Sequence, residues 1–82
     1  MDTNTIFPKS ILITDDHSII RLTLREWLAE EFPELSIQEA SSGEQALELL
    51  AEEPRPELVL MDFRLPDRSG IDVTKDIKNT LS

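Results

Sequence analysis

The stretch that decides the fold spans residues 58–70 and reads Leu58-Val59-Leu60-Met61-Asp62-Phe63-Arg64-Leu65-Pro66-Asp67-Arg68-Ser69-Gly70. Its first four residues form a short, unbroken apolar run, which is typical of a strand buried on both faces of a parallel sheet. The run ends at an acid, Asp62, and a loop with Pro66 and Gly70 follows. Because open α/β sheets bind ligands at the carboxyl ends of their strands, Asp62 is the first candidate functional residue.

Two further strands are expected upstream of this one. Residues 11–14 are apolar without clean alternation, and two acids, Asp15 and Asp16, follow them directly. Residues 35–40 alternate between apolar and polar side chains, which favours an edge strand with one wetter face. The apolar run before Asp62 is then the third strand, with expected bounds of 57–61.

A helix is expected after the first strand, over residues 18–31, with Pro33 beyond its end. Asp16 or Ser18 is expected to cap its first turn, because their side-chain oxygens can accept hydrogen bonds from free amides. The single histidine, His17, is assigned to the loop or the helix start. The apolar stripe of this helix comprises Ile20, Leu24, Trp27 and Leu28, and core packing is the expected role of the tryptophan.

Two more helices complete the pattern. Ser42 and Gln45 have the spacing of a capping box, which predicts a helix start there. The apolar face of that second helix comprises Ala46, Leu47 and Leu50. The last helix is expected from about residue 71, with Ile71, Thr74, Ile77 or Lys78, and Leu81 spaced along it. Three strand–helix units in succession predict an α/β fold with a parallel sheet and right-handed crossovers.

The composition restricts the classes of function. The 82 residues carry 17 acids and 8 bases, a net charge of −9, which argues against direct nucleic-acid binding by this segment. Cysteine is absent, so there is no disulfide framework and no thiolate metal site. No apolar run approaches the length of a membrane span, and the first ten residues do not resemble a signal peptide. A soluble, cytoplasmic domain is expected.

The acids that end the first and third strands are expected to meet. If these two strands are parallel neighbours, Asp15, Asp16 and Asp62 gather at one edge of the sheet. Carboxylates placed so close repel each other unless a cation lies among them, and oxygen ligands with room for water suit Mg²⁺. One acid could then act as a nucleophile toward a phosphoryl group. The alternative, that each acid merely caps a helix or ends a strand, does not account for their matching positions.

Residues 11–17, Ile-Leu-Ile-Thr-Asp-Asp-His, taken with residues 58–70, resemble the receiver domain of two-component response regulators. The resemblance covers the chain from about Ser10 onward and includes the Pro and Gly that follow Asp62 at four and eight residues. It implies a flavodoxin-like receiver fold with a sheet of order 2-1-3, the first helix on one face and the other two helices on the opposite face. Residues 1–9 are a flexible lead-in in this interpretation, and residues 10–82 form the domain.

The resemblance also implies roles for individual residues. Asp62 accepts a phosphoryl group from a sensor histidine kinase, Asp16 binds Mg²⁺ directly, and Asp15 binds it chiefly through water. The metal ligands are completed by Asp62 and the backbone carbonyl of Arg64. Asp-Asp-His followed four residues later by Arg21 is similar to regulators whose output is a helix-turn-helix DNA-binding domain. The chain is expected to be a substrate of its kinase and not an enzyme.

The sequence departs from the family in length. Receivers have five strands, with a hydroxyl residue after the fourth and a lysine after the fifth that contact the phosphoryl group. This sequence ends at Ser82, about where the fourth strand would begin, so the last two strand–helix units and the output domain are expected to be missing. The third strand then becomes an apolar edge without lysine or internal proline, which predicts a homo-oligomer formed through that edge.

Two other functions remain open. The chain could act as a dimerisation or decoy module that is never phosphorylated. It could also be a phosphohydrolase with an aspartyl nucleophile, but those enzymes typically carry a second acid two residues after the nucleophile, and here that position is Arg64.

Overall fold

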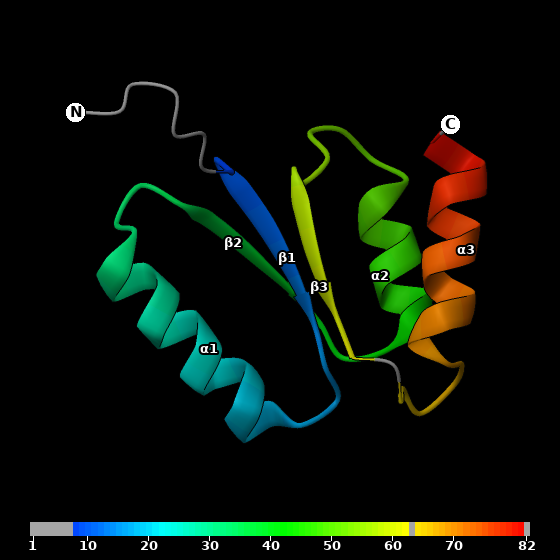
Figure 1. Cartoon of the computed structure of the whole chain (residues 1–82), viewed down its shortest axis with the longest axis horizontal. Helices are drawn as coiled ribbons and strands as arrows, with labels where there is room; N and C mark the ends of the chain where they lie inside the picture. The colour runs from blue at the N-terminus through cyan, green and yellow to red at the C-terminus, as the bar shows by residue number, and fades with distance from the viewer. Residues whose placement is uncertain (1–7, 63, 82) are drawn as a thin grey trace.

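The chain folds as three strand–helix units around one parallel sheet (Figure 1). A computed structural model describes residues 8–62 and 64–81. The elements are β1 (Ser10–Thr14), α1 (Ser18–Glu31), β2 (Ser36–Ala40), α2 (Gly43–Leu50), β3 (Leu58–Met61) and α3 (Gly70–Leu81). The strands pair in the order β2-β1-β3, and both pairings are parallel. The predicted α/β class, sheet and strand order are confirmed.

The register of the sheet makes the three strands end level with one another. Thr14 at the end of β1 lies opposite Ala40 of β2 and Met61 of β3. The backbone pairing continues for one more residue, because Asp15 N–H donates to Ala40 O over 3.0 Å and Asp62 N–H donates to Thr14 O over 2.9 Å. Asp15 and Asp62 therefore leave the sheet side by side at its carboxyl edge.

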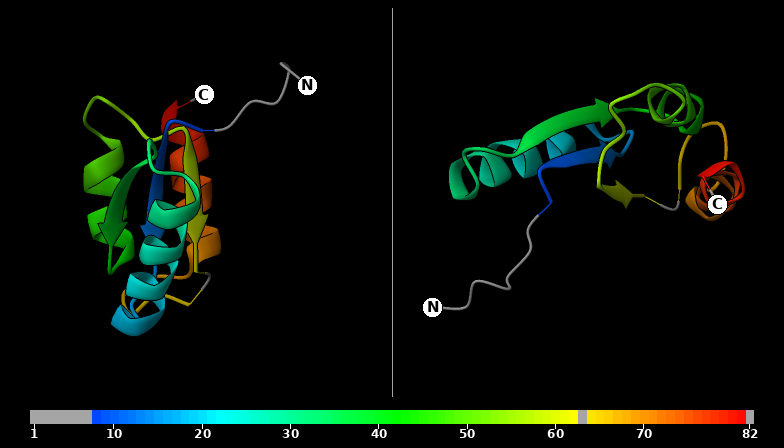
Figure 2. Two further views of the ribbon diagram at one scale, coloured as in Figure 1. Left: turned by 90° about the vertical axis from the view of Figure 1, so that its left-hand side faces the viewer. Right: turned by 90° about the horizontal axis from the view of Figure 1, so that it is seen from above.

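The helices cover the sheet from both sides. Figure 2 shows α1 on one face and α2 with α3 on the other, as the sequence predicts. The alternation of side chains along β1 serves both layers, because Leu12 points to one face while Ile11 and Ile13 point to the other. On the α2–α3 face the buried residues are Leu12, Ala40, Ala46, Leu50 and Val73. On the α1 face they are Ile11, Ile13 and Leu28.

β3 differs from the sequence expectation of a strand buried on both faces. Val59 and Met61 pack against the α2–α3 core, but Leu58 and Leu60 on the opposite face are 43% and 38% exposed. The cause is the position of α1, which packs across β1 and β2 and leaves this face of β3 partly uncovered. In the described residues β3 pairs with β1 alone, so it is the edge strand that the sequence predicted.

α1 corrects two further expectations. Trp27 is 55% exposed, and its ring packs edge-on against Phe32 with the centroids 6.5 Å apart, so it is not a core residue. Ile20 is also half exposed. Neither Asp16 nor Ser18 caps the helix, because the N-cap is His17, whose side chain makes no capping hydrogen bond.

The start of α2 carries the predicted cap. Ser42 Oγ accepts a hydrogen bond from the backbone N–H of Gln45 over 3.1 Å. The Gln45 side chain reaches back to the N–H of Ser41 instead of that of the cap residue, over 2.7 Å. A Cβ placed on Gly43 would approach Val73 Cγ2 to 2.7 Å, so α3 packs too closely on this turn for a larger residue.

The face that α3 turns to the core matches the predicted stripe only in part. Val73 is fully buried and Ile77 packs on the same core, whereas Ile71 is 58% exposed. The Thr74 hydroxyl donates within its own helix, to Gly70 O over 2.8 Å. The side chain of Leu81, also named in the predicted stripe, lies outside the described ones.

The lead-in expected over residues 1–9 lies largely outside the described residues, which begin at residue 8. Lys9 is tied to the sheet: its carbonyl accepts from Ser36 N–H over 2.9 Å, and its N–H donates to Glu57 Oε1 over 2.7 Å. Across the described parts of the chain, no helix has the length and apolar character needed to cross a membrane.

Candidate functional site: an acid cluster at the carboxyl edge of the sheet

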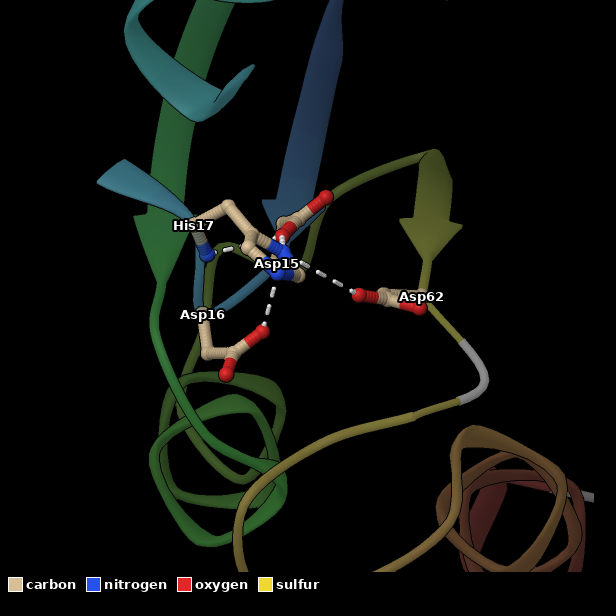
Figure 3. A group of neighbouring side chains, drawn as sticks. All are labelled: Asp15, Asp16, His17 and Asp62. Carbon is tan, nitrogen blue, oxygen red and sulfur yellow. Dashed lines mark hydrogen bonds and ion pairs between the residues drawn. The ribbon is translucent and has the colours of Figure 1, made fainter. Parts of the chain in front are cut away.

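Four side chains meet where β1 and β3 end (Figure 3). Asp15, Asp16 and His17 follow β1, and Asp62 follows β3. One potential ligand atom from each of the four lies within 4.8 Å of the corresponding atoms of the others. The structure therefore brings together the three carboxylates that the sequence predicted to converge, and it adds a histidine.

His17 lies at the centre of this cluster. Its Nδ1 is 2.8 Å from Asp15 Oδ1, 3.2 Å from Asp16 Oδ1 and 3.9 Å from Asp62 Oδ2. The backbone N–H of His17 also donates to Asp15 Oδ1 over 2.8 Å. The sequence assigned His17 to the loop or the helix start, and the structure makes it the N-cap residue of α1, but its ring was not predicted to lie among the acids. The feature of the sequence that could have indicated this location is that His17 directly follows Asp15 and Asp16.

The charges of the cluster alter two pKa values. The hydrogen bond to Asp15, with the negative charge of Asp16 next in importance, raises the pKa of His17 above its ordinary value of 6.5. Burial alone would raise the pKa of Asp15, but its hydrogen bonds from the His17 backbone and ring outweigh burial and hold it below 3.8. The lowered pKa of Asp15 favours its ionised form, and the raised pKa of His17 favours the protonated imidazole.

Arg21 of α1 is hydrogen-bonded to the loop that carries the acid pair. Its Nη1 donates to the backbone carbonyl of Asp15 over 2.7 Å, and its Nε donates to Glu39 Oε1 of β2 over 2.9 Å. Arg25, one turn further along α1, reaches the second oxygen of Glu39 at 3.4 Å. Arg21 therefore links α1, β2 and the loop that carries the acids.

Asp62 is held from the other side of the cluster. Its side chain is 20% exposed, and its Oδ1 accepts a hydrogen bond from the backbone N–H of Arg64 over 3.0 Å. Arg64 forms an isolated antiparallel bridge with Ser69, which closes the following loop on itself. The hydrogen bond therefore holds one oxygen of the Asp62 carboxylate, while part of the group remains accessible to solvent.

The same loop is attached to α2 by Asp67. Asp67 Oδ1 accepts from Gly43 N–H over 2.9 Å, and Oδ2 accepts from Glu44 N–H over 3.0 Å. These two hydrogen bonds lower the pKa of Asp67 below its ordinary value of 3.8. The contact was not predicted from the sequence. An acid after Pro66 signals a turn, but nothing local shows that it binds a helix more than twenty residues earlier.

The donor set of the cluster fits a hard divalent cation. Three carboxylates supply oxygen ligands, and the Asp16 and Asp62 side chains are 36% and 20% exposed, which leaves access for water. Mg²⁺ takes one or two carboxylates and retains several waters. The exposed edge of the cluster suits this cation better than it suits an ion that needs a closed cage of protein ligands.

Comparison with known proteins identifies the family of this arrangement. The model of the "Response regulator receiver domain" family matches residues 11–81, which include all four members of the acid cluster.

Curated relatives share the same region. The chain is 46% identical over 71 residues to the transcriptional activator protein ExaE of Pseudomonas putida, which covers 87% of this chain and 33% of the activator. It is 44% identical over 70 residues to the chemotaxis protein CheY of Halobacterium salinarum, which covers 85% of this chain and 56% of that protein. The chain thus spans about a third of the activator and about half of the chemotaxis protein.

The fold has solved counterparts. The response regulator protein TrrA of Thermotoga maritima, solved in complex with Mg²⁺ and BeF, aligns with a TM-score of 0.81 and 36% identity. The alignment covers 89% of this chain and 61% of that one.

Proposed function

The chain belongs to the family of response regulator receiver domains, and from this premise we propose that it is a phosphoacceptor module of two-component signal transduction. In this proposal Asp62 accepts a phosphoryl group from a sensor histidine kinase. The observation that carries the proposal is the position of Asp62, at the end of β3 and within 4.8 Å, by ligand atoms, of the acid pair that ends β1.

The proposed reaction is a displacement at phosphorus. A carboxylate oxygen of Asp62 attacks, the new O–P bond forms while the P–N bond of the phosphohistidine breaks, and the histidine nitrogen keeps the electron pair. The Arg64 N–H bond to Oδ1 fixes the carboxylate and leaves the second oxygen to attack. The chain is a substrate that assists its own modification, so we do not class it as an enzyme.

The proposed metal is Mg²⁺. Asp16 would bind it directly, Asp15 chiefly through water, and Asp62 with the Arg64 backbone carbonyl would complete the protein ligands. When bound, the ion would neutralise negative charge on the oxygens of the phosphoryl group being transferred. The donor chemistry of the cluster and the Mg²⁺–BeF complex of the relative TrrA support this assignment.

The proposal also covers nucleic-acid binding, the output domain and the cellular location of the chain. Because the net charge is −9, a direct nucleic-acid contact by this segment is not proposed. A DNA-binding output in the longer regulator is proposed instead, supported by the 46% identity to a transcriptional activator. We place the chain in the cytoplasm, and we equate residues 10–82 with the first three strand–helix units of a receiver.

We also propose a homo-oligomer formed through the β3 edge. Leu58 and Leu60 are half exposed, and in the described residues the outer backbone of β3 pairs with no strand. An apolar edge of this kind favours pairing with another strand. Pairing of two β3 edges across a two-fold axis would satisfy the outer backbone groups of both strands.

Acetyl phosphate tests the phosphoacceptor function without a kinase. Incubation with Mg²⁺ should give a single phosphoryl adduct by intact mass, labile to hydroxylamine as an acyl phosphate is, and incubation with excess chelator should give none. An interaction module that is never phosphorylated gives no adduct under either condition. A phosphohydrolase would release inorganic phosphate continuously and would not stop at one equivalent.

A further inference from the structure

The loop between β3 and α3 completes the first turn of α2. A helix start leaves backbone N–H groups without partners inside the helix. Ser42 Oγ accepts from Gln45 N–H, and Asp67, from the distant loop, accepts from both Gly43 and Glu44. One local and one remote side chain therefore share the capping of this helix.

Asp67 lies near the tip of a small closed hairpin. Arg64 and Ser69 form an antiparallel bridge at its base, and Leu65 N–H donates to Arg68 O over 3.2 Å. A hairpin closed in this way moves as a unit, because each of its sides is hydrogen-bonded to the other. A constraint applied at Asp67 is therefore transmitted to Arg64.

Arg64 contacts the proposed phosphoacceptor, Asp62, through its backbone. Its backbone N–H donates to Asp62 Oδ1 over 3.0 Å. We propose that Asp67 is a positioning residue for the site: by fixing the hairpin to α2, it holds the Arg64 N–H that orients the Asp62 carboxylate. This inference rests on the proposed function, since it assigns the positioning of the same acceptor.

The hairpin has other anchors. At its carboxyl end Ser69 is bonded to the first turn of α3, because its Oγ accepts from Asp72 N–H and its carbonyl accepts from Val73 N–H, each over 3.1 Å. Leu65 packs on the α2–α3 core.

Arg68 pairs with the Asp76 side chain of α3 and lies 3.9 Å from Glu44. The Asp76 and Glu44 side chains are 46% and 70% exposed, so they can rotate and their charges are screened. The partners of Asp67 are backbone amides of a helix, which cannot rotate away. Among the polar contacts of the hairpin with α2, Asp67 is therefore the one best able to fix the position of the loop.

Two variants separate positioning from capping. Asp67→Ala removes the remote cap and frees the hairpin, whereas Ser42→Ala removes the local cap of the same helix turn and leaves the hairpin attached. Both should cost α2 similar stability. Asp67→Asn keeps one acceptor oxygen and should give an intermediate result, and it replaces the alanine variant if that variant fails to fold.

The direct readout is the ¹⁵N order parameter of the Arg64 amide in the uniformly labelled chain. It should remain at about 0.85 in wild type and in Ser42→Ala, and fall to about 0.6 in Asp67→Ala. The rate of phosphorylation by acetyl phosphate should fall roughly tenfold in Asp67→Ala alone, because misplacement of a reacting group by about 1 Å can lower a rate by up to about a hundredfold.

An Arg64 order parameter that is unchanged in Asp67→Ala, or that falls equally in Ser42→Ala, would overturn the inference and reduce Asp67 to a helix cap. A wild-type chain that takes no phosphate would instead refute the proposed function. The order parameter then still decides whether Asp67 holds the loop at Asp62.

Discussion

Arg21 of α1 donates a hydrogen bond from Nη1 to the backbone carbonyl of Asp15, over 2.7 Å. This contact joins a helix to the loop that carries the acid pair, and the same guanidinium binds Glu39 of β2. Only 19% of the Arg21 side chain is exposed, so solvent screens these contacts weakly. The position of the acids therefore depends on a residue outside the cluster.

Replacement of Arg21 should destabilise the fold. Arg21→Ala removes the bond to the Asp15 carbonyl and the bond to Glu39, and should lower the free energy of unfolding by about 2 kcal/mol. Arg25→Ala is the matched control, because Arg25 binds the same acid, Glu39, but is 53% exposed. This variant should lose less than about 0.5 kcal/mol of unfolding free energy. Urea denaturation of the three proteins measures both losses, and equal losses would contradict the role of the Asp15 contact.

Asp16 should be required for metal binding. Asp16→Asn removes the ligand charge nearest to solvent, and calorimetric titration with Mg²⁺ should detect no binding. Asp72→Asn, an equivalent change at the start of α3 and outside the four-residue cluster, should bind as wild type does. An unchanged Mg²⁺ titration in Asp16→Asn would rule out the proposed metal site.

The contribution of Asp67 to stability should disappear in acid. Its hydrogen bonds from Gly43 and Glu44 lower its pKa in the folded state below 3.8. A lowered folded-state pKa means that the stabilisation is complete above the unfolded pKa of about 3.9 and is lost as the pH falls through the lower folded value.

The stability difference between wild type and Asp67→Asn should therefore be constant from neutral pH to about pH 5 and should shrink below about pH 4. The difference between wild type and Ser42→Ala should not change in this way, because a serine does not titrate there. Urea denaturation at several pH values tests this, and a difference for Asp67→Asn that grows in acid would have the wrong sign.

The β3 edge should cause self-association at micromolar concentration, as sedimentation can show. Leu60→Lys places a charge on that edge and should shift the equilibrium toward monomer. Leu22→Lys is the control, because Leu22 is similarly exposed, at 48%, but lies on α1. A wild-type chain that is a stable monomer at every concentration would refute the proposed oligomer.

The sequence was sufficient for the architecture because the architecture depends on local patterns. Short apolar runs followed by helical spacing define three strand–helix units, and parallel strands place their carboxyl ends at one edge. Asp15 and Asp62 could therefore be predicted to lie at the same edge of the sheet without coordinates. The order of the strands came from the resemblance to receivers, and the structure confirms it.

The errors concern which face of an element is covered, and this depends on distant residues. Trp27 has the spacing of a core position, but α1 packs across β1 and β2 at an angle that leaves it 55% exposed. Leu58 and Leu60 were predicted to be buried, yet α1 packs across β1 and β2 and leaves their face of β3 only partly covered. On α3 the buried position is Val73 and not Ile71, because the approach to Gly43 sets the rotation of the helix.

The carboxylates of the site were predicted, and the residues that support them were not. The position of His17 directly after the acid pair brings its backbone close to the acids but does not determine where its ring lies, and nothing in the local sequence indicates the bond from Asp67 to α2. The first depends on the conformation of a loop, and the second joins segments that meet only once the sheet has formed.

The central claim is that Asp62 is the single phosphoacceptor, and intact-mass spectrometry tests it most directly. Wild type, Asp62→Asn and Asp72→Asn are incubated with Mg²⁺ and acetyl phosphate and compared with untreated samples. We expect one labile phosphoryl adduct on wild type and on Asp72→Asn, and none on Asp62→Asn. An adduct that persists on Asp62→Asn, or no adduct on any of the three proteins, would contradict the claim.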